Sequence, residues 1–355
     1  MGVDPEKLAR ALERGASEAS APCRLDMGGT VDLPTFHYAL RHVDPCTFNV
    51  ALNMRTTVRI STYEKGMVKV SSKGFESVEY PLDEVPMVHA VGLMMAVAAW
   101  FRASGVHIEV ESRSPPKSAL GGSSVAAVAA IGAFSAALER MGDPAYTKKQ
   151  TVLLGHTLES VCAGVPCGMQ DHLAAVYGGV NAWHWPALPG EPPYVRRTVL
   201  SPNEHEWLEE RLLLAYCGKQ HESADVNATW VDRFLVGMDR PRWESMCRLT
   251  HNFVDAVAVR DTRAAIDAME RELAIRLEMT PEVLDRSMLS LIDAAWHNGC
   301  GARFAGAGGG GCVWAMGEPG EIAKTRAAWR EIVDGIRDAR LLEVGIDVEG
   351  LRAGS

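Results

Sequence analysis

The sequence predicts a mixed fold of strands and helices, of the α+β or α/β class, divided between two domains. The chain has 355 residues, more than most single domains contain. Strand-like and helix-like patterns follow one another up to residue 217, and long helical patterns cluster after that point. Hydrophobic residues make up 47% of the chain, which is enough to bury a core and excludes a disordered protein.

The amino-terminal part is expected to begin with a helix and continue into strands. Residues 5–15 have an amphipathic helical pattern that Gly15 ends. Residues 47–60 alternate as a strand does. Lys65-Gly66 predicts a turn into a second strand at 67–71, so that the two strands form a hairpin.

The middle of the chain shows apolar runs separated by glycines and prolines. The elements expected there are a helix at 88–101, a strand at 106–110, helices at 123–140, 146–162 and 170–177, and a strand at 180–185. Four prolines then fall between residues 186 and 193, so 186–202 is the best linker candidate. We therefore predict an amino-terminal domain at 1–200 and a carboxy-terminal domain at 201–355.

The carboxy-terminal part is expected to be rich in helices. The predicted elements are a strand at 212–217, helices at 224–236, 241–258, 261–277 and 281–297, two short strands around a glycine run, a helix near 319–335, and a strand at 340–345.

Composition excludes several classes of protein. The net charge of −9 argues against a nucleic-acid binder. The eight cysteines are scattered without a C-x-x-C pair, which favours free thiols in a reducing compartment over a zinc site. The uncharged stretch 118–138 is rich in alanine and serine, as in a buried helix rather than a membrane span. The charged amino-terminus is unlike a signal peptide, so we expect a soluble cytoplasmic protein.

The chain has 33 glycines, about eight more than average usage predicts. Nine of them lie in three runs, which are Gly28-Gly29, Gly121-Gly122, and Gly306 with Gly308–Gly311. The run Pro115–Ser124 lies between a predicted strand and a predicted helix and contains Gly121-Gly122. Glycines let backbone N–H groups approach a ligand, and the start of a helix favours anions. An ordinary turn with a serine cap explains the run about equally well. A Walker A loop is excluded, because no Gly-Lys-Ser/Thr follows.

The third run, from Gly306 to Gly311, matches G-x-G-x-x-G. A dinucleotide-binding loop would be followed by a helix, whereas the residues 312–316 favour a strand. We interpret the run as the loop of a strand hairpin that packs against another segment, for which the loop at 115–124 is the candidate.

The runs at 115–124 and 306–311, with two further segments, resemble the motifs of the GHMP kinase superfamily. The sugar kinase branch of that superfamily includes galactokinase and heptose-phosphate kinases. Pro116–Ser124 is similar to the phosphate loop Pro-x-x-Gly-Leu-Gly-Ser-Ser, with Ala119 and Gly122 as departures. Residues 305–312 are similar to the carboxy-terminal glycine motif, and 21–26 to the Ala-Pro-Gly-Arg opening. Residues 159–172 resemble the galactokinase segment Glu-x4-Gly-Val-x-Cys-Gly-x-x-Asp-Gln. The resemblance implies an amino-terminal domain like domain 2 of ribosomal protein S5 and a ferredoxin-like carboxy-terminal domain.

The resemblance also implies ATP- and Mg²⁺-dependent transfer of a phosphoryl group to a hydroxyl of a small molecule. Asp171 would be the base and Arg24 would keep it ionised. Ser123 and Glu159 match the family's magnesium ligands. The positions implied to bind ATP are Pro116, Lys117, Ser118, Ala119, Leu120, Gly121, Gly122, Ser123, Ser124, Gly308 and Gly309. Without the other motifs, Asp171 would be interpreted as a helix cap, Glu159 as a solvated residue and Arg24 as an ion-pair partner of Asp26.

The substrate is indicated by the segment after the first motif. The chain lacks the Gly-Glu-His-x-Asp-Tyr of galactokinases, which argues against galactose itself. Its Gly28–Pro34 segment looks more like the Gly-Gly-Gly-Thr-Asp-x-Pro of heptose-phosphate kinases, with Val31 inserted. The residues expected to bind a sugar or sugar phosphate are Gly29, Thr30, Asp32, His37 and Asp171. A substrate phosphate could be anchored by Arg41, Lys219 or His221, although an exposed charged loop is the better explanation of each of these residues.

Two other hypotheses remain open from the sequence. The first is a catalytically silent sensor of a sugar or nucleotide on the same fold, which the presence of Asp171, Glu159 and Ser123 disfavours. The second is a kinase of a non-sugar alcohol such as mevalonate or homoserine, which the galactokinase-like spacing and the Gly-Gly-Thr segment disfavour.

Overall fold

A computed structural model describes residues 4–164, 167–219 and 223–354. The helices are α1 (Pro5–Glu13), α2 (Pro34–Leu40), α3 (Gly92–Trp100), α4 (Gly122–Glu139), α5 (Lys148–Ala163), α6 (Gln170–Tyr177), α7 (His205–Glu209), α8 (Ser223–Leu235), α9 (Arg240–Ala258), α10 (Thr262–Met279), α11 (Arg286–His297) and α12 (Pro319–Asp334). The strands are β1 (Ser17–Met27), β2 (Cys46–Thr62), β3 (Met67–Ser72), β4 (Val78–Pro81), β5 (Val106–Ser112), β6 (Val180–His184), β7 (Val195–Leu200), β8 (Leu212–Tyr216), β9 (Gly301–Phe304), β10 (Cys312–Met316), β11 (Arg340–Leu342) and β12 (Arg352–Ala353).

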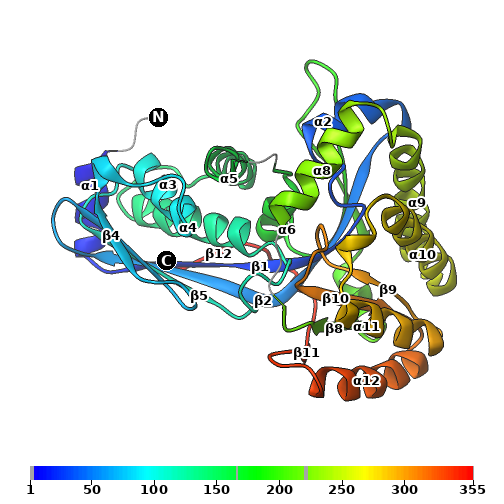
Figure 1. The fold of residues 1–355 in the computed structure, drawn as a ribbon. Coiled ribbons are helices and arrows are strands. Elements are labelled where there is room, and N and C mark those ends of the chain that lie inside the picture. The colour runs from blue at the N-terminus through cyan, green and yellow to red at the C-terminus, as the bar shows by residue number, and fades with distance from the viewer. Residues whose placement is uncertain (1–3, 165–166, 220–222, 355) are drawn as a thin grey trace.

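The larger sheet has eight strands and is built around β2 (Figure 1). The amino-terminal half of β2 pairs with β6 and its carboxy-terminal half with β5, while β1 follows both halves. The β1–β2 register shifts between Pro22 and Arg24. Because proline has no N–H to donate and an irregularity of this kind redirects the next side chain, the shift changes where Arg24 points.

One face of this sheet is covered by helices, among which α4 is central (Figure 1). α4 is the one helix in the described ranges that is long and apolar enough to cross a membrane, but 78% of it is buried inside the protein. Seven of its 18 residues are alanines, so α4 can approach β1 and β2 closely. The prediction that the uncharged stretch forms a buried helix is confirmed.

The carboxy-terminus returns to the larger sheet. β12 pairs with β1 in the register Ala19–Ala353. Arg55 of β2 forms an ion pair with the buried Asp347, and its Nη2 donates to the carbonyl of Gly350 at 2.7 Å. Gly178 and Gly350 are in close contact, because a Cβ on Gly178 would lie 2.5 Å from the Gly350 nitrogen. The larger sheet therefore contains both the first and the last strand of the described chain.

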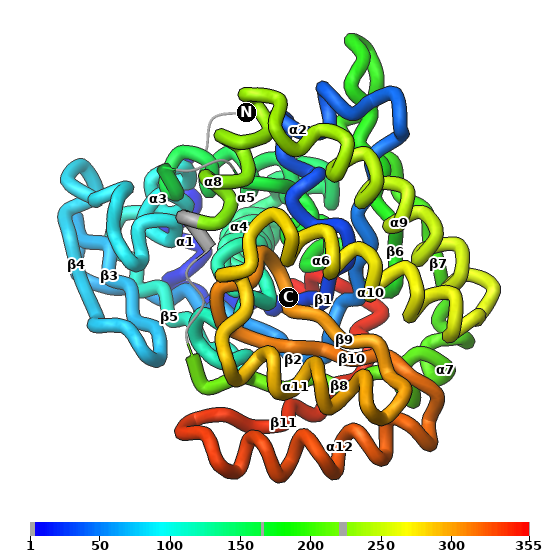
Figure 2. The backbone as a smooth tube through the Cα atoms, turned by 45° about the vertical axis from the view of Figure 1, so that its right-hand side comes forward, coloured from blue at the N-terminus to red at the C-terminus, as the bar shows by residue number. Residues whose placement is uncertain are grey.

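The smaller sheet has four antiparallel strands in the order β11-β8-β10-β9. Along the chain its elements run strand, helices, strand, strand, helix, strand, which is the ferredoxin-like arrangement. The helices α11 and α12 pack against it, as Figure 2 shows for the lower part of the molecule. The predicted mixed class with a ferredoxin-like second part is confirmed, while the boundary after residue 200 stays a prediction.

The predicted hairpin between 47–60 and 67–71 is wrong in its pairing. The chain does reverse at 63–66, but β5 lies between β2 and β3, antiparallel to the first and parallel to the second. The backbone of Gly105 accepts from Tyr63 and donates to Met67, so the entry to β5 separates the two strands. A local turn signal cannot reveal such an inserted strand, because that strand is distant in sequence.

The proposed linker 186–202 is also only partly extended loop. It contains β7, which pairs with β6 and continues the larger sheet. The helix predicted at 281–297 begins at Arg286, after a short 3₁₀ turn at Pro281–Val283, and the last predicted strand ends at Leu342. The strands β1, β4, β7 and β12 and the helices α2 and α7 were not predicted as separate elements.

Candidate functional site

A cleft of about 650 Å³ lies between the larger sheet and the loop of the smaller one. Its lining comes from β1, the loop before α4, the start of α6, and the loop between β9 and β10. Arg24 and Asp171 lie at its floor, while Gly306 and Ala307 close it from the smaller sheet. Both parts of the chain therefore contribute to one cavity.

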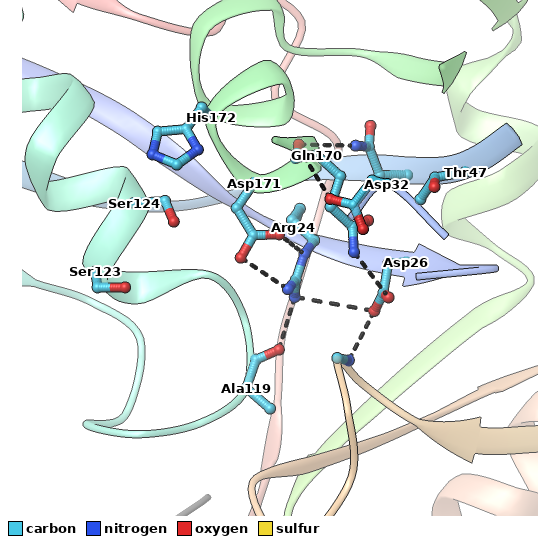
Figure 3. Close-up of polar contacts among 12 residues, drawn as sticks. Arg24, Asp26, Asp32, Thr47, Ala119, Ser123, Ser124, Gln170, Asp171 and His172 are labelled. Carbon is cyan, nitrogen blue, oxygen red and sulfur yellow. Dashed lines mark hydrogen bonds and ion pairs between the residues drawn. The ribbon is translucent and has the colours of Figure 1, made fainter. Parts of the chain in front are cut away.

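Arg24 is held in one orientation by several contacts (Figure 3). Its backbone N–H donates to Leu120 O at 3.2 Å and so connects β1 to the loop before α4. Its Nε and Nη2 donate to the two oxygens of Asp171 at 2.7 and 3.0 Å, and its Nη1 donates to Ala119 O at 2.6 Å. The guanidinium of Arg24 thus links Asp171, at the floor of the cleft, to the loop at 116–124.

Asp171 stands in the first turn of α6, with its side chain 21% exposed toward the cleft. Burial raises the pKa of Asp171 above its ordinary value, and Arg24 offsets this only in part. The predicted contact between Arg24 and Asp171 is confirmed. The expectation that Arg24 sets the protonation of Asp171 was incomplete, because burial acts more strongly in the opposite direction.

Behind this pair lies a buried network of charges. Asp26 is fully buried, accepts from the Gly306 N–H at 2.7 Å, and lies 3.9 Å from Arg24 Nη1. Glu272 pairs with Arg276 at 2.5 Å and with Arg303 at 3.0 Å. Burial acts to raise the pKa of Asp26, but the positive charges of Arg24 and Arg303 outweigh burial and lower this pKa below its ordinary value. The carboxylate of Asp26 is therefore ionised. The ion pair of Arg24 with Asp26 and its contact with Asp171 exist together.

The loop at 116–124 has an unusual backbone. Lys117, Ala119 and Gly121 all have positive φ, at 51°, 63° and 79°. A Cβ on Gly121 would lie 3.0 Å from Asp171 Oδ2, so only glycine fits there without displacing the carboxylate. α4 begins at Gly122, so the loop leads directly into a helix amino-terminus. Such a terminus carries free N–H groups and favours anions.

The glycine run of the smaller sheet packs against this loop. A Cβ on Gly311 would lie 2.6 Å from Ser118 O, and one on Gly306 would lie 3.1 Å from Ala119 O. The interpretation of the run as a hairpin loop packed against 115–124 is confirmed. Gly308 and Gly309 instead contact Val283, through a close approach and a hydrogen bond of 2.8 Å, respectively.

Beside the helix start, three polar side chains surround the carboxylate of Glu159. Ser123 Oγ donates to Glu159 Oε1 at 2.5 Å, and Ser124 Oγ donates to Oε2 at 2.6 Å. His172 Nε2 lies 3.1 Å from the same Oε2. Burial raises the pKa of Glu159, but His172 and the two hydroxyls outweigh it and bring this pKa to about 2. Glu159 is therefore an anion that faces two hydroxyls.

The opposite side of the cleft is formed by Thr30, Asp32, Gly168 and Gln170. Asp32 is buried and accepts from the Gln170 N–H at 3.1 Å. A Cβ on Gly168 would lie 1.7 Å from Asp32 Oδ2, so this glycine provides the space that the carboxylate occupies. Burial raises the pKa of Asp32 to about 6, and the negative charges of Asp171 and Asp26 add to the effect.

Comparison with known proteins gives two family matches. The model described as the GHMP kinases N terminal domain matches residues 88–179, and that described as GHMP kinases C terminal matches residues 253–335. They occur in the order expected for the family. The chain belongs to the GHMP kinase family.

Relatives and solved structures agree with this assignment. The mevalonate kinase of Pyrococcus horikoshii is 24% identical over 306 residues, which cover 77% of this chain and 83% of that protein. The galactokinase of Lactococcus lactis, solved with galactose, has a TM-score of 0.72 at 18% identity and covers 98% of both chains. The D-glycero-D-manno-heptose 1-phosphate kinase of Bacteroides thetaiotaomicron has a TM-score of 0.68 at 14% identity, covering 96% of this chain and 99% of that one. The solved structures support the shared fold.

This GHMP kinase places most of the predicted ATP contacts at the cleft. The loop residues that line it are Pro116, Lys117, Ser118, Ala119, Gly121, Gly122 and Ser123. Leu120 and Ser124 are buried behind them, and Gly308 and Gly309 face Val283, so these four residues are not part of the lining. From the same glycine run, Gly306 and Ala307 line the cleft instead of Gly308 and Gly309.

Only some of the residues predicted to bind the sugar or sugar phosphate lie at the cleft. Thr30, Asp32 and Asp171 line the cleft, whereas Gly29 and His37 do not. A Cβ on Gly29 would lie 2.3 Å from Asp26 Oδ2, and the His37 ring stacks on Trp185 at 6.1 Å. Lys219 lies 3.8 Å from Asp285, and neither it nor the exposed Arg41 lines the cleft. His221 lies outside the described residues.

Several lining residues of this kinase were missed from the sequence. The part of the cleft beyond the loop is apolar and includes Val70, Phe75, Val91, Met94 and Val110. Gln170 and Asn227 were also missed. The apolar residues come from separate strands and helices, so no short motif contains them. The exposed aromatic Phe75, in a turn rich in polar residues, was the only local signal.

The cations Lys73, Arg113, Lys117 and Arg340 also line the cleft. In the part of the chain that the structure describes, no carboxylate forms an ion pair with any of the four. Their positive charge is compatible with an anionic ligand in a protein of net charge −9.

Proposed function

We propose that this kinase transfers the γ-phosphate of ATP, with Mg²⁺, to a hydroxyl of a sugar or sugar phosphate of the galactose or heptose type. The observation that carries the proposal is the pair of Asp171 and Arg24 at the floor of the cleft. The carboxylate lies beside Gly121 of the phosphate loop on one side and near the polar acceptor side on the other. It is therefore between the two places where donor and acceptor would bind. We also propose a cytoplasmic location.

The nucleotide is proposed to occupy the loop and the apolar part of the cleft. Backbone N–H groups of Gly121–Ser123, at the start of α4, are suited to the β- and γ-phosphates. The apolar walls at Val91 and Met94 are suited to a flat purine. Lys117, which is exposed at the mouth, adds positive charge near the phosphates.

The donor set around Glu159 fits a magnesium ion that is shared with phosphate. One carboxylate and the Ser123 hydroxyl are hard oxygen ligands, and Mg²⁺ usually takes only one or two carboxylates, with phosphates and water as its other ligands. Among the described residues there is no cluster of three His, Cys, Asp or Glu side chains that could hold a metal. When bound, the ion neutralises charge that develops on the transferred phosphoryl group.

The proposed chemical step uses Asp171 as a base. The acceptor oxygen forms a bond to the γ-phosphorus, its proton moves to an oxygen of Asp171, and the bond from the phosphorus to the departing ADP oxygen breaks. The raised pKa of Asp171 makes this carboxylate a stronger base than an ordinary aspartate. Arg24 keeps the carboxylate in one orientation through both of its oxygens.

The acceptor side supports a polyhydroxy substrate. Asp32 can accept hydrogen bonds from hydroxyls, Thr30 can donate or accept, and Gln170 can do both. The second candidate is mevalonate, because the curated relative from Pyrococcus horikoshii is a mevalonate kinase. The polar groups named here recognise neutral hydroxyls as readily as they recognise the diol part of such an acid, so substrate tests must include both classes.

The deciding experiment is a coupled ADP-release assay over hexoses, heptoses, their phosphates, mevalonate and homoserine. We expect turnover with a sugar or sugar phosphate, and phosphorus NMR of the product will locate the new ester. Turnover with mevalonate alone would transfer the proposal to the second candidate. ATP binding without ADP release from any acceptor would favour the silent sensor.

A further inference from the structure

The two oxygens of Glu159 have different surroundings. Oε2 contacts Ser124 at 2.6 Å and His172 at 3.1 Å, and these two residues are 4% and 0% exposed. Oε1 contacts Ser123, which is exposed and lines the cleft. One oxygen is therefore enclosed by the protein, whereas the other lies next to a hydroxyl that faces the ligand side.

The enclosed side is tightly packed. Gly155 lies one helical turn before Glu159 on α5, and a Cβ there would lie 2.8 Å from His172 Cδ2. The His156 ring meets the His172 ring edge-on at 5.8 Å, and its own Nε2 lies 3.0 Å from the Cys167 carbonyl. The imidazole of His172 is thus fixed by its neighbours and has little freedom to leave Oε2.

The chemistry of the contact assigns a role to each atom. A carboxylate oxygen can only accept, so the 3.1 Å contact with His172 is attractive when Nε2 carries the ring proton. The Ser124 hydroxyl donates its hydrogen bond to the same Oε2. The galactokinase segment that this region resembles has glutamine after the aspartate, whereas this chain has His172. Both side chains can donate one hydrogen bond at this position, but the ring is the more rigid donor.

We propose that Ser124 and His172 are positioning residues that fix Oε2 of Glu159, so that Oε1 and Ser123 Oγ form the oxygen pair presented to a divalent cation. This rests on the proposed function, because it assumes a metal–nucleotide complex at this place. It assigns Ser124 to the support of Glu159 rather than to nucleotide contact. Figure 3 shows both serines on α4, with His172 beyond Ser124.

The experiment measures metal binding separately from nucleotide binding. Binding of Mn²⁺ in the presence of saturating ADP is followed by the electron paramagnetic resonance signal of free Mn²⁺, and ADP binding in EDTA is followed by calorimetry. The variants are S123A, S124A, H172L and H172Q. S135A is the matched control, because Ser135 is also buried on α4 but bonds Tyr146 N instead of Glu159.

We expect H172L and S124A to weaken Mn²⁺ binding by about 10-fold, as loss of a residue that orients a metal ligand does. S123A, which loses a ligand, should weaken it at least as much. H172Q should restore most of the affinity, and S135A should leave it unchanged. In EDTA, H172L and S124A should bind ADP as the wild type does.

Four results would overturn the proposal. Wild-type Mn²⁺ affinity in both H172L and S124A would show that the enclosed oxygen needs no support. An equal loss of ADP affinity in EDTA, or an equal effect of S135A, would show that the role is only structural. Absence of Mn²⁺–ADP binding by the wild type would remove the proposed function together with this proposal, whereas a wrong acceptor sugar has no effect on any of these measurements. If H172L does not fold, S124A and H172Q carry the same test.

Discussion

The two sides of the cleft use glycine in opposite ways. On the side that we propose binds the phosphates of ATP, Gly121 and Gly122 line the cleft. On the acceptor side, Gly28 and Gly29 are turned away from it. A Cβ on Gly28 would lie 2.4 Å from Thr250 Oγ1 of α9, and the carbonyl of Gly29 accepts from Arg276 of α10 at 2.8 Å.

The difference shows that similar glycine pairs can serve access or assembly. Gly122 has open space where a Cβ would lie, and Gly121 lets the loop approach the carboxylate of Asp171. Gly28 and Gly29 let the buried charges of the second part of the chain approach the first, and this fixes the loop that presents Thr30 and Asp32. A motif identifies a glycine pair but does not show which partner needs the space.

The largest effect is expected for D171N, which tests whether the two sides can be separated. Loss of the base should lower kcat by about 10³-fold, since positioned general bases contribute 10²–10⁴-fold. ATP affinity, which belongs to the phosphate side, should stay within about twofold of the wild type. ADP release and calorimetry measure the two quantities. Turnover near the wild-type rate would remove Asp171 from the proposed role.

The next effect concerns stability. G29A places a methyl group against Asp26 and Gln170, at 2.3 and 2.8 Å from their polar atoms, and should lower the free energy of unfolding by about 3 kcal/mol. G122A is the matched control on the phosphate side, because nothing lies within 4 Å of its Cβ. Urea denaturation compares them. Equal stability of the two variants would contradict the contrast between the sides.

The raised pKa of Asp32 predicts that the free energy of unfolding depends on pH. The measurement is made in a D171N background, in which residue 171 does not titrate. The pKa of Asp32 is raised to about 6 in the folded chain, so the folded state binds this proton more tightly than the unfolded state does. The stability contributed is present at acid pH and is lost as the pH rises through 6. D32N has no carboxyl group to titrate at this position and does not lose this stability. The free energy of unfolding of D32N relative to the chain that keeps Asp32 should therefore rise by about 1–2 kcal/mol between pH 5 and pH 7.5. An advantage that shrinks over this range would contradict the assignment.

The smallest effect is expected on the phosphate loop. Ala119 has a φ of 63°, which costs a residue with a Cβ about 1 kcal/mol. A119G should therefore raise the free energy of unfolding by up to about 1 kcal/mol, measured in urea. A loss of stability would show that the contacts of the Ala119 methyl with the glycine run outweigh the relief of the backbone.

Prediction from the sequence succeeded where a short motif holds the chemistry together. The contact of Arg24 with Asp171, the Ser123–Glu159 pair and the packing of the 306–311 run on the phosphate loop were all inferred from ordered motifs. Each of these motifs has a fixed local backbone, so the sequence carries most of the geometry.

Prediction failed where the answer depends on which distant segment lies alongside. β5 inserts between β2 and β3, and the apolar wall of the cleft comes from separate elements. Gly29 was expected to bind substrate because nothing local shows that Asp26 and Arg276 occupy its surroundings. Long-range pairing of this kind is set by the packing of the whole core and not by local propensity.

The return of the carboxy-terminus to β1 has a consequence for synthesis of the chain on the ribosome. The strand that carries Arg24 gains its outer neighbour, and Arg55 gains Asp347, only from residues at the end of the chain. A nascent chain that stops before residue 346 has the sequence motifs of the cleft but lacks these contacts. The larger sheet can therefore be completed only after residues 347–353 have been synthesised, and fragments that stop before them should depend on chaperones for their solubility.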